Sequence, residues 1–300
     1  MDLLYIQSLN VVKKKILIAR DLMPFDPATV PVIIDAAKAV AKADASTAAR
    51  AISVLDLTSL NDNDTDAVIE ALCKRAVNTA GHTAAVCVYA PFIKTARAAL
   101  GENPVKIATV VNFPAGGNDV EAVKAETEAA VADGADEIDL VLPYKAFLAG
   151  DIATCEAMLD TTRAACGTKA GMKVILESGY FDDLAKVYNA ARLCIKHGAN
   201  FVKTSTGKIP VGATPEAAVT MITAVRDAKA EDGAICGFKA AGGVRTTADA
   251  AHYIAIADNI MGEGWAAPAT FRFGASGVLT ALLETYGVDQ SGEAKPTGNY

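Results

Sequence analysis

The sequence predicts an α/β protein, a single (β/α)₈ TIM barrel with an added N-terminal helical segment. From about residue 47, short apolar runs alternate with Ala-rich helical stretches, and eight such runs can be counted. This alternation implies parallel pairing, and eight parallel strands close into a barrel. A length of 300 residues and an aliphatic composition (52% hydrophobic, 6% aromatic) suit one large domain. The alternative, an open doubly wound sheet, should carry a glycine-rich turn after its first strand, but residues 58–61 contain no glycine.

The chain divides into three parts. We expect a helical extension at 1–42, the barrel at 43–288 and a flexible tail at 289–300. Within the extension, 3–23 is a basic amphipathic helix candidate, 24–31 holds helix-breaking prolines, and 32–42 is an Ala-rich helix. We expect the extension to serve packing or subunit contacts. The tail is rich in Gly, Pro, Ser and charged residues, which cannot form a core.

The barrel elements follow in order along the chain. Strands are expected at 52–57, 84–89, 106–112, 136–142, 172–178, 200–205, 235–240 and 270–274. Helices are expected between them, at 64–77, 120–133, 154–165, 182–197, 215–229 and 247–257.

Composition excludes several classes of function. A net charge of −7 argues against nucleic acid as a ligand and gives no support for an anionic membrane surface. The apolar stretch near the N-terminus is interrupted by Lys13-Lys14-Lys15, so it is neither a signal-peptide core nor a membrane span. The six cysteines form no C-x-x-C pair and the three histidines have no metal-ligand spacing. We therefore expect a cytoplasmic protein with no metal site.

Five polar side chains interrupt the aliphatic strands. Side chains of a strand point alternately to opposite faces. If the aliphatic face meets the helices, Asp56, Cys87, Asp139, Lys203 and Lys239 all point into the barrel. Barrel interiors are normally filled with aliphatic layers, so ionisable groups converging near the strand ends indicate an active site. A structural network of ion pairs is the alternative.

The lysines suggest carbonyl chemistry. Lys203 follows Phe201-Val202 and precedes a small polar turn. Burial and the neighbouring Lys239 both disfavour its charge, and a neutral lysine can form a Schiff base with an aldehyde. A nearby aspartate can then move protons. A lysine whose charged tip reaches solvent at the strand end is the simpler interpretation.

Glycine turns follow the last three strands. They are Thr206-Gly207-Lys208, Ala241-Gly242-Gly243-Val244-Arg245 and Gly274-Ala275-Ser276-Gly277. In barrels such turns often bind phosphate through backbone N–H groups and a helix N-terminus.

Four segments carry a resemblance to a known family. They read L-D-L-T-S-L-N-D at 55–62, A-D-E-I-D-L-V at 135–141, F-V-K-T-S-T-G-K at 201–208 and G-F-K-A-A-G-G-V-R at 237–245. From about residue 47 to its C-terminus, the sequence resembles deoxyribose-phosphate aldolase, a family of class I aldolases. The resemblance implies a TIM barrel that reversibly cleaves 2-deoxy-D-ribose 5-phosphate to D-glyceraldehyde 3-phosphate and acetaldehyde, in deoxyribose catabolism. It implies small phosphosugar and aldehyde substrates and no cofactor.

The resemblance also implies residue roles. Lys203 would form the Schiff base, Lys239 would perturb it, and Asp139 would relay protons. Asp56 would hold the polar network, and the terminal Tyr300 would fold over the barrel mouth to exchange a proton with the enamine. The phosphate site would comprise Gly207, Lys208, Gly242, Gly243, Gly274 and Ser276.

Three positions qualify the match. Cys87 corresponds to a pocket-wall cysteine of the family, but a small apolar filler fits equally well. Ala240 stands where the family usually has proline, and Gly277 stands where a second serine is common. The glycine removes one hydroxyl that could reach a phosphate and keeps its N–H.

Two other functions stay open. One is a Schiff-base aldolase of the transaldolase or fructose-bisphosphate type, which the paired lysines disfavour and a substrate panel would decide. The other is a catalytically silent barrel that binds a phosphosugar or a protein partner. The sequence leaves a homo-oligomer, such as a dimer, undecided.

Overall fold

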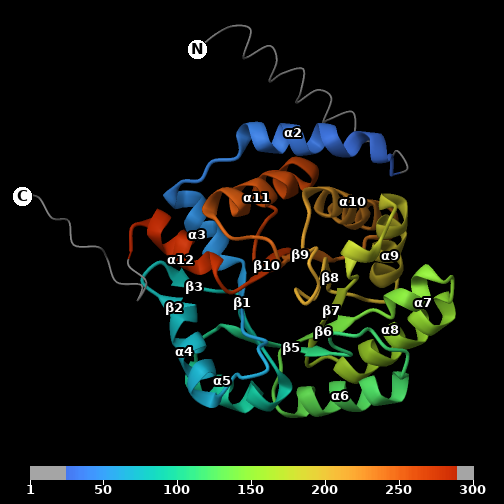
Figure 1. The fold of residues 1–300 in the computed structure, drawn as a ribbon, viewed down its shortest axis with the longest axis horizontal. Coiled ribbons are helices and arrows are strands. Elements are labelled where there is room, and N and C mark those ends of the chain that lie inside the picture. The colour runs from blue at the N-terminus through green and yellow to red at the C-terminus, as the bar shows by residue number, and fades with distance from the viewer. Residues whose placement is uncertain (1–24, 289–300) are drawn as a thin grey trace, which may run out of the picture.

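The described part of the chain forms a closed barrel of parallel strands surrounded by helices. The computed structural model describes residues 25–288. Its eight barrel strands are ordered β1-β10-β9-β8-β7-β6-β5-β4 around the ring, and β4 pairs with β1 to close it (Figure 1). This confirms the predicted (β/α)₈ architecture and excludes the open sheet. The expected helix at 3–23 and the tail at 289–300 lie outside the described residues.

The eight barrel strands lie close to where the sequence pattern placed them. They are β1 (Leu55–Thr58), β4 (Ala85–Val88), β5 (Lys106–Val111), β6 (Glu137–Val141), β7 (Gly171–Ile175), β8 (Phe201–Lys203), β9 (Gly237–Ala241) and β10 (Phe271–Ala275). Several boundaries were wrong by two or more residues. Residues 52 and 53 end a helix, β7 ends at Ile175 instead of residue 178, β8 ends at Lys203 instead of residue 205, and β9 begins at Gly237 instead of residue 235. Just after β8, the hydroxyls of Thr204 and Ser205 donate to the Ala241 carbonyl oxygen. A small antiparallel pair, β2 (Val77–Asn78) and β3 (Gly81–His82), precedes β4.

All six expected barrel helices are present. They are α4 (Asp66–Ala76), α6 (Val120–Ala132), α8 (Ile152–Cys166), α9 (Leu184–Lys196), α10 (Pro215–Asp232) and α11 (Thr247–Met261). The pattern did not single out α3 (Ala45–Ser53), α5 (Ile93–Leu100), α7 (Tyr144–Leu148) or α12 (Val278–Tyr286). For α3 the cause is local: Ile52 and Val54 read as a strand start, whereas Asp44 caps a helix there by accepting from the Thr47 N–H.

The main hydrophobic core lies between the strands and the helices. Leu55 and Leu57 of β1, like Ile138 and Leu140 of β6, point outward into this aliphatic layer and are fully buried. Burying such side chains contributes about 1.5–3 kcal/mol each. Asp56 lies between the two leucines of β1, so period two sends its side chain into the barrel.

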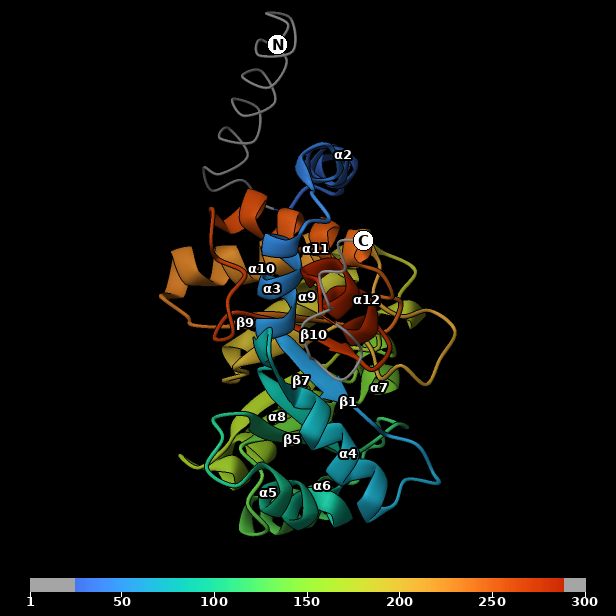
Figure 2. The same cartoon turned by 90° about the vertical axis from the view of Figure 1, so that its left-hand side faces the viewer.

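The N-terminal helix α2 (Val30–Val40) covers one side of the barrel. It lies across α10 and α11 in both views (Figure 1 and Figure 2). The helix starts two residues before the expected boundary because Pro31 falls in its first turn, where proline is tolerated. Phe25 adds a stacked contact with Tyr188 of α9, with ring centroids 4.9 Å apart. None of the helices within residues 25–288 is both long and apolar enough to cross a membrane.

Candidate active site

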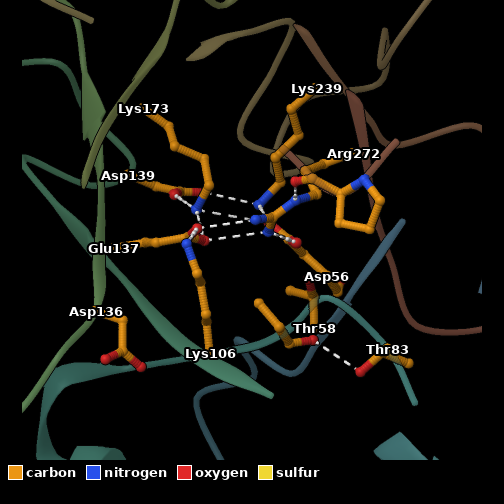
Figure 3. Close-up of polar contacts among 12 residues, drawn as sticks. Asp56, Thr58, Thr83, Lys106, Asp136, Glu137, Asp139, Lys173, Lys239 and Arg272 are labelled. Atoms are coloured by element: carbon orange, nitrogen blue, oxygen red, sulfur yellow. Dashed lines mark hydrogen bonds and ion pairs between the residues drawn. The ribbon is translucent and has the colours of Figure 1, made fainter. Parts of the chain in front are cut away.

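A cluster of charged side chains fills the interior of the barrel (Figure 3). Six strands contribute inward-pointing members, and each side chain is at most 4% exposed. The members are Asp56 of β1, Glu137 and Asp139 of β6, Lys173 of β7, Lys203 of β8, Lys239 of β9 and Arg272 of β10. The two sequence interpretations, active site and ion-pair network, therefore describe the same group of residues.

Asp139 lies at the centre of this cluster. Its Oδ2 accepts hydrogen bonds from Lys203 Nζ at 2.8 Å and from Lys239 Nζ at 2.9 Å. Its Oδ1 accepts from Lys173 Nζ at 2.8 Å. One carboxylate thus contacts three lysine side chains from three strands.

Lys239 is held by two carboxylates. Besides Asp139, its Nζ donates to Asp56 Oδ2 at 2.5 Å. The neighbouring strand makes room for it, because a Cβ at Gly274 would lie 2.9 Å from Lys239 Cε. Gly274 was expected to act in a phosphate turn, yet it lies within β10, where its missing side chain also accommodates this lysine.

The two lysines differ in ionisation. Burial lowers the pKa of both, but for Lys239 the attraction of Asp139 and Asp56 outweighs burial and holds the pKa above its usual value. For Lys203 burial and the nearby Lys239 ammonium prevail over Asp139, so its pKa is lowered. Burial raises the pKa of Asp139, but the three lysines more than compensate and hold it well below its usual range. Lys203 is therefore the amine that loses its proton more easily.

Lys203 is also the lysine that reaches a cavity. A space of about 550 Å³ opens at the C-terminal ends of the strands, and its lining includes Lys203 but not Lys239. Five expected phosphate-site residues line the same cavity: Gly207, Lys208, Gly242, Gly274 and Ser276. Gly243 lines a neighbouring cavity of about 450 Å³ together with Gly277 and Arg245. Lys208 Nζ donates to the Leu60 carbonyl oxygen at 2.6 Å across the first cavity.

Cys87 lies in an apolar part of the barrel interior. It packs with Leu60, Ala108 and Val110, and its side chain is fully buried. Burial raises the pKa of its thiol, which keeps it protonated and poorly nucleophilic. Its surroundings are those of a small apolar filler. Tyr300 lies outside the described residues.

Sequence reasoning missed three members of the cluster: Glu137, Lys173 and Arg272. The signal was present, because the period of two that exposed Asp139 applies to Glu137 two residues earlier. Lys173 likewise stands between Met172 and Val174, which face the outer core. Arg272 likewise stands between Phe271 and Phe273, which belong to the outer core.

The residues from 25 to 288 contain no group of three or more His, Cys, Asp or Glu side chains that could hold a metal ion. Lysines provide the reactive nitrogen atoms of the cavity.

Comparisons with known proteins agree with this geometry. The DeoC/LacD family aldolase model matches residues 50–281. A curated deoxyribose-phosphate aldolase from Agrobacterium fabrum is 50% identical over 237 residues, covering 79% of this chain and 90% of that protein.

Solved structures with the same fold include two candidate deoxyribose-phosphate aldolases. One from Toxoplasma gondii has a TM-score of 0.74 at 22% identity, covering 81% of this chain and 94% of its own. One from Coccidioides immitis has a TM-score of 0.70 at 24% identity, covering 87% of this chain and 98% of its own.

Proposed function

The chain belongs to the DeoC/LacD family of aldolases, and from that premise we propose that it is a deoxyribose-phosphate aldolase acting through a Schiff base at Lys203. Its substrate would be 2-deoxy-D-ribose 5-phosphate, cleaved reversibly to D-glyceraldehyde 3-phosphate and acetaldehyde. One observation carries the proposal: Lys203 and Lys239 share Asp139 Oδ2, and only Lys203 of the two lines the cavity.

The reaction begins at the Lys203 amine. The neutral nitrogen attacks the C1 aldehyde of the open-chain sugar, and loss of water gives a protonated imine. The imine accepts the electron pair of the C2–C3 bond as that bond breaks and the C3 hydroxyl loses its proton. D-Glyceraldehyde 3-phosphate leaves, and the remaining enamine is protonated at C2. Water then hydrolyses the imine and releases acetaldehyde.

Asp139 and Lys239 support these proton transfers. The Asp139 carboxylate accepts from the Lys203 nitrogen at 2.8 Å, so it can accept and return a proton, directly or through a water molecule. The Lys239 ammonium favours the neutral form of Lys203 and stabilises negative charge that develops in the cavity. Asp56 holds Lys239 in place.

The phosphate would bind at the rim of the same cavity. Gly207 and Gly242 present backbone at positive φ of 78° and 77°, and Lys208 adds a cation. Ser276 precedes α12, whose N-terminus favours an anion.

Borohydride trapping tests the proposal. Protein incubated with acetaldehyde and borohydride should gain one ethyl group at Lys203, mapped by peptide mass spectrometry. Lys203→Arg should lose both the label and the release of acetaldehyde from 2-deoxyribose 5-phosphate. Lys186→Arg, on the exposed face of α9 where Lys186 pairs with Asp182, is the matched control and should keep both. Label at another lysine, or turnover without label, would refute the Schiff base at Lys203.

The proposal has four further parts. A place in deoxyribose catabolism follows from the substrate. A cytoplasmic location is supported by the six cysteines, all of which are free thiols. The roles of Tyr300 and of a homodimer stay predictions, to be checked by deuterium exchange into acetaldehyde with Tyr300→Phe and by sedimentation.

A further inference from the structure

A second layer of ion pairs lies beneath the catalytic lysines. Lys173 Nζ contacts Glu137 Oε2 at 2.6 Å and Asp139 Oδ1 at 2.8 Å. Arg272 donates to Glu137 from both terminal nitrogens, at 2.9 and 3.2 Å, and its Nη1 donates to Asp56 Oδ1 at 2.6 Å. None of Glu137, Lys173 and Arg272 lines the cavity of about 550 Å³. These three residues, which we call the lower layer, touch the carboxylates Asp139 and Asp56 without lining that cavity.

The charges of the cluster balance without Lys203. The carboxylates are Asp56, Glu137 and Asp139. The cations that each contact at least two of them are Lys173, Lys239 and Arg272. A proton on Lys203 would add one uncompensated positive charge to a group that solvent hardly reaches. An unbalanced buried charge raises the free energy of the folded protein. The balance is restored most easily when the amine with the fewest ion pairs loses its proton. Lys203 is that amine, because its ion pair among residues 25–288 is with Asp139, which two other lysines share.

Other titratable groups also face Lys203. Cys87 of β4 lies near enough to interact with its charge, and Glu177, which follows β7, also interacts with it. Glu177 is bound to Thr206, whose N–H and hydroxyl both donate to its carboxylate. These two groups contribute to the starting pKa of Lys203, but they are unchanged when a member of the lower layer is replaced.

We propose that Glu137, Lys173 and Arg272 are positioning residues whose charges set how easily Lys203 loses its proton: Lys173 and Arg272 offset the carboxylates Asp139 and Asp56 and so favour the neutral amine, and Glu137 limits that effect. The inference rests on the proposed function, because it assigns a purpose to a neutral Lys203. If the same ion pairs had a purely structural role, removing charges of opposite sign would not shift the pKa of Lys203 in opposite directions.

Two substitutions of opposite sign separate these roles. Glu137→Gln removes a negative charge while nearly keeping shape, which leaves the cluster one positive charge in excess and should lower the pKa of Lys203. Lys173→Met removes a positive charge at similar length and should raise it. Each shift should be about one pH unit, the size expected for one unit charge whose effect is partly offset by the other charges of a buried cluster. The double variant restores the balance and should return close to wild type.

The measurement is the rate at which acetaldehyde forms an imine at Lys203, trapped with cyanoborohydride between pH 5 and pH 10. This rate rises with the neutral fraction of the amine, so its midpoint reports the pKa of Lys203. The midpoint should move down in Glu137→Gln, up in Lys173→Met and back in the double variant.

Lys106 supplies a matched control. Its Nζ lies 3.3 Å from Glu137 Oε1, and it approaches that carboxylate from the side opposite to Lys173 and Lys239 (Figure 3). Because 53% of the Lys106 side chain is exposed, solvent screens its charge. Lys106→Met removes the same charge as Lys173→Met and should move the midpoint by less than about 0.3 pH units.

The outcomes distinguish the two proposals. If wild-type protein gains no label at Lys203, the proposed function itself fails. If wild type is labelled but the single variants shift in the same direction, or not at all, the lower layer is structural and this inference fails. Should Lys173→Met not fold, Glu137→Gln decides alone: a downward shift supports the inference, and an unchanged or raised midpoint overturns it.

Discussion

Asp139 accepts hydrogen bonds from three lysines, and these lysines differ in their other carboxylate partners. Lys239 has Asp56 as a second carboxylate and Lys173 has Glu137, whereas Lys203 has neither. In a site that excludes water, each additional carboxylate holds a proton more firmly. A single residue type can therefore serve as a fixed cation in two positions and, in the proposed mechanism, as the nucleophile in the third.

At the scale of single residues, the role of the Lys239 charge can be tested by substitution. Lys239→Leu should reduce aldol turnover by about 10²-fold or more, because the ammonium that stabilises developing charge is lost. Without that neighbouring charge the pKa of Lys203 should rise, so the midpoint of imine formation should move to higher pH. The pH profile of acetaldehyde trapping measures this. Lys186→Leu removes an exposed lysine and should leave the rate and the profile unchanged. An unaltered profile in Lys239→Leu would assign that lysine a packing role.

At the scale of elements, the loops after β8, β9 and β10 decide the shape of the cavity rim. Gly242 has a φ of 77°, and a Cβ there would lie 3.2 Å from Gly212 Cα. The following helix α11 is held at its start by a capping box between Thr246 and Asp249. The loop is thus fixed at both ends, with its backbone close to a second glycine.

Gly242→Ala should therefore disturb phosphate binding more than chemistry. A side chain in the left-handed region costs about 1–2 kcal/mol, and the loop must also move away from Gly212. The KM for 2-deoxyribose 5-phosphate should rise about tenfold or more, while cleavage of unphosphorylated 2-deoxyribose, slow from the start, should change little.

Gly264→Ala is the control for backbone strain. Gly264 has a φ of 83° and open space around it, in the loop before β10, so the variant should lose stability without a change in KM. Equal effects of Gly242→Ala on the two sugars would refute the assigned phosphate rim.

At the scale of the whole molecule, closure of the barrel brings together groups that are far apart in the chain. Asp56 and Arg272 are 216 residues apart, and their side chains meet at 2.6 Å because β1 and β10 are neighbours in the ring. The interior of the described barrel is thus polar at its centre and apolar near Cys87, Ala108 and Val110. Helix α2 extends the outer layer without reaching the cavity lining.

The enzyme as a whole should not need a metal ion. In the proposed mechanism the protonated imine at Lys203 would itself accept the electron pair, so bond cleavage would require no Lewis acid. Activity should survive prolonged treatment with EDTA within experimental error, and added Zn²⁺ should not increase it. Loss of activity in EDTA with recovery on adding zinc would point to a metal-dependent aldolase.

Local sequence patterns were sufficient for the architecture and for most of the inward-pointing groups. Alternation of strands and helices depends on residues next to each other, and so does the period of two that turns Asp56 away from Leu55 and Leu57. The motifs around Lys203 and Lys239 are equally local. For the same reason the pattern failed where a short segment was ambiguous, as at α3, whose apolar end resembled the start of a strand.

Only the tertiary structure decided which groups meet. Nothing in the segment around Asp139 reveals that its two oxygens are shared by Lys173, Lys203 and Lys239, since those contacts depend on how the strands are staggered around the closed ring. For that reason the sequence did not show that Glu137, Lys173 and Arg272 meet, although the period of two places each of them on the inner face of its strand. Which lysine is the nucleophile also depends on these partners, because the ionisation of a buried amine is set by the charges around it and not by its neighbours in sequence.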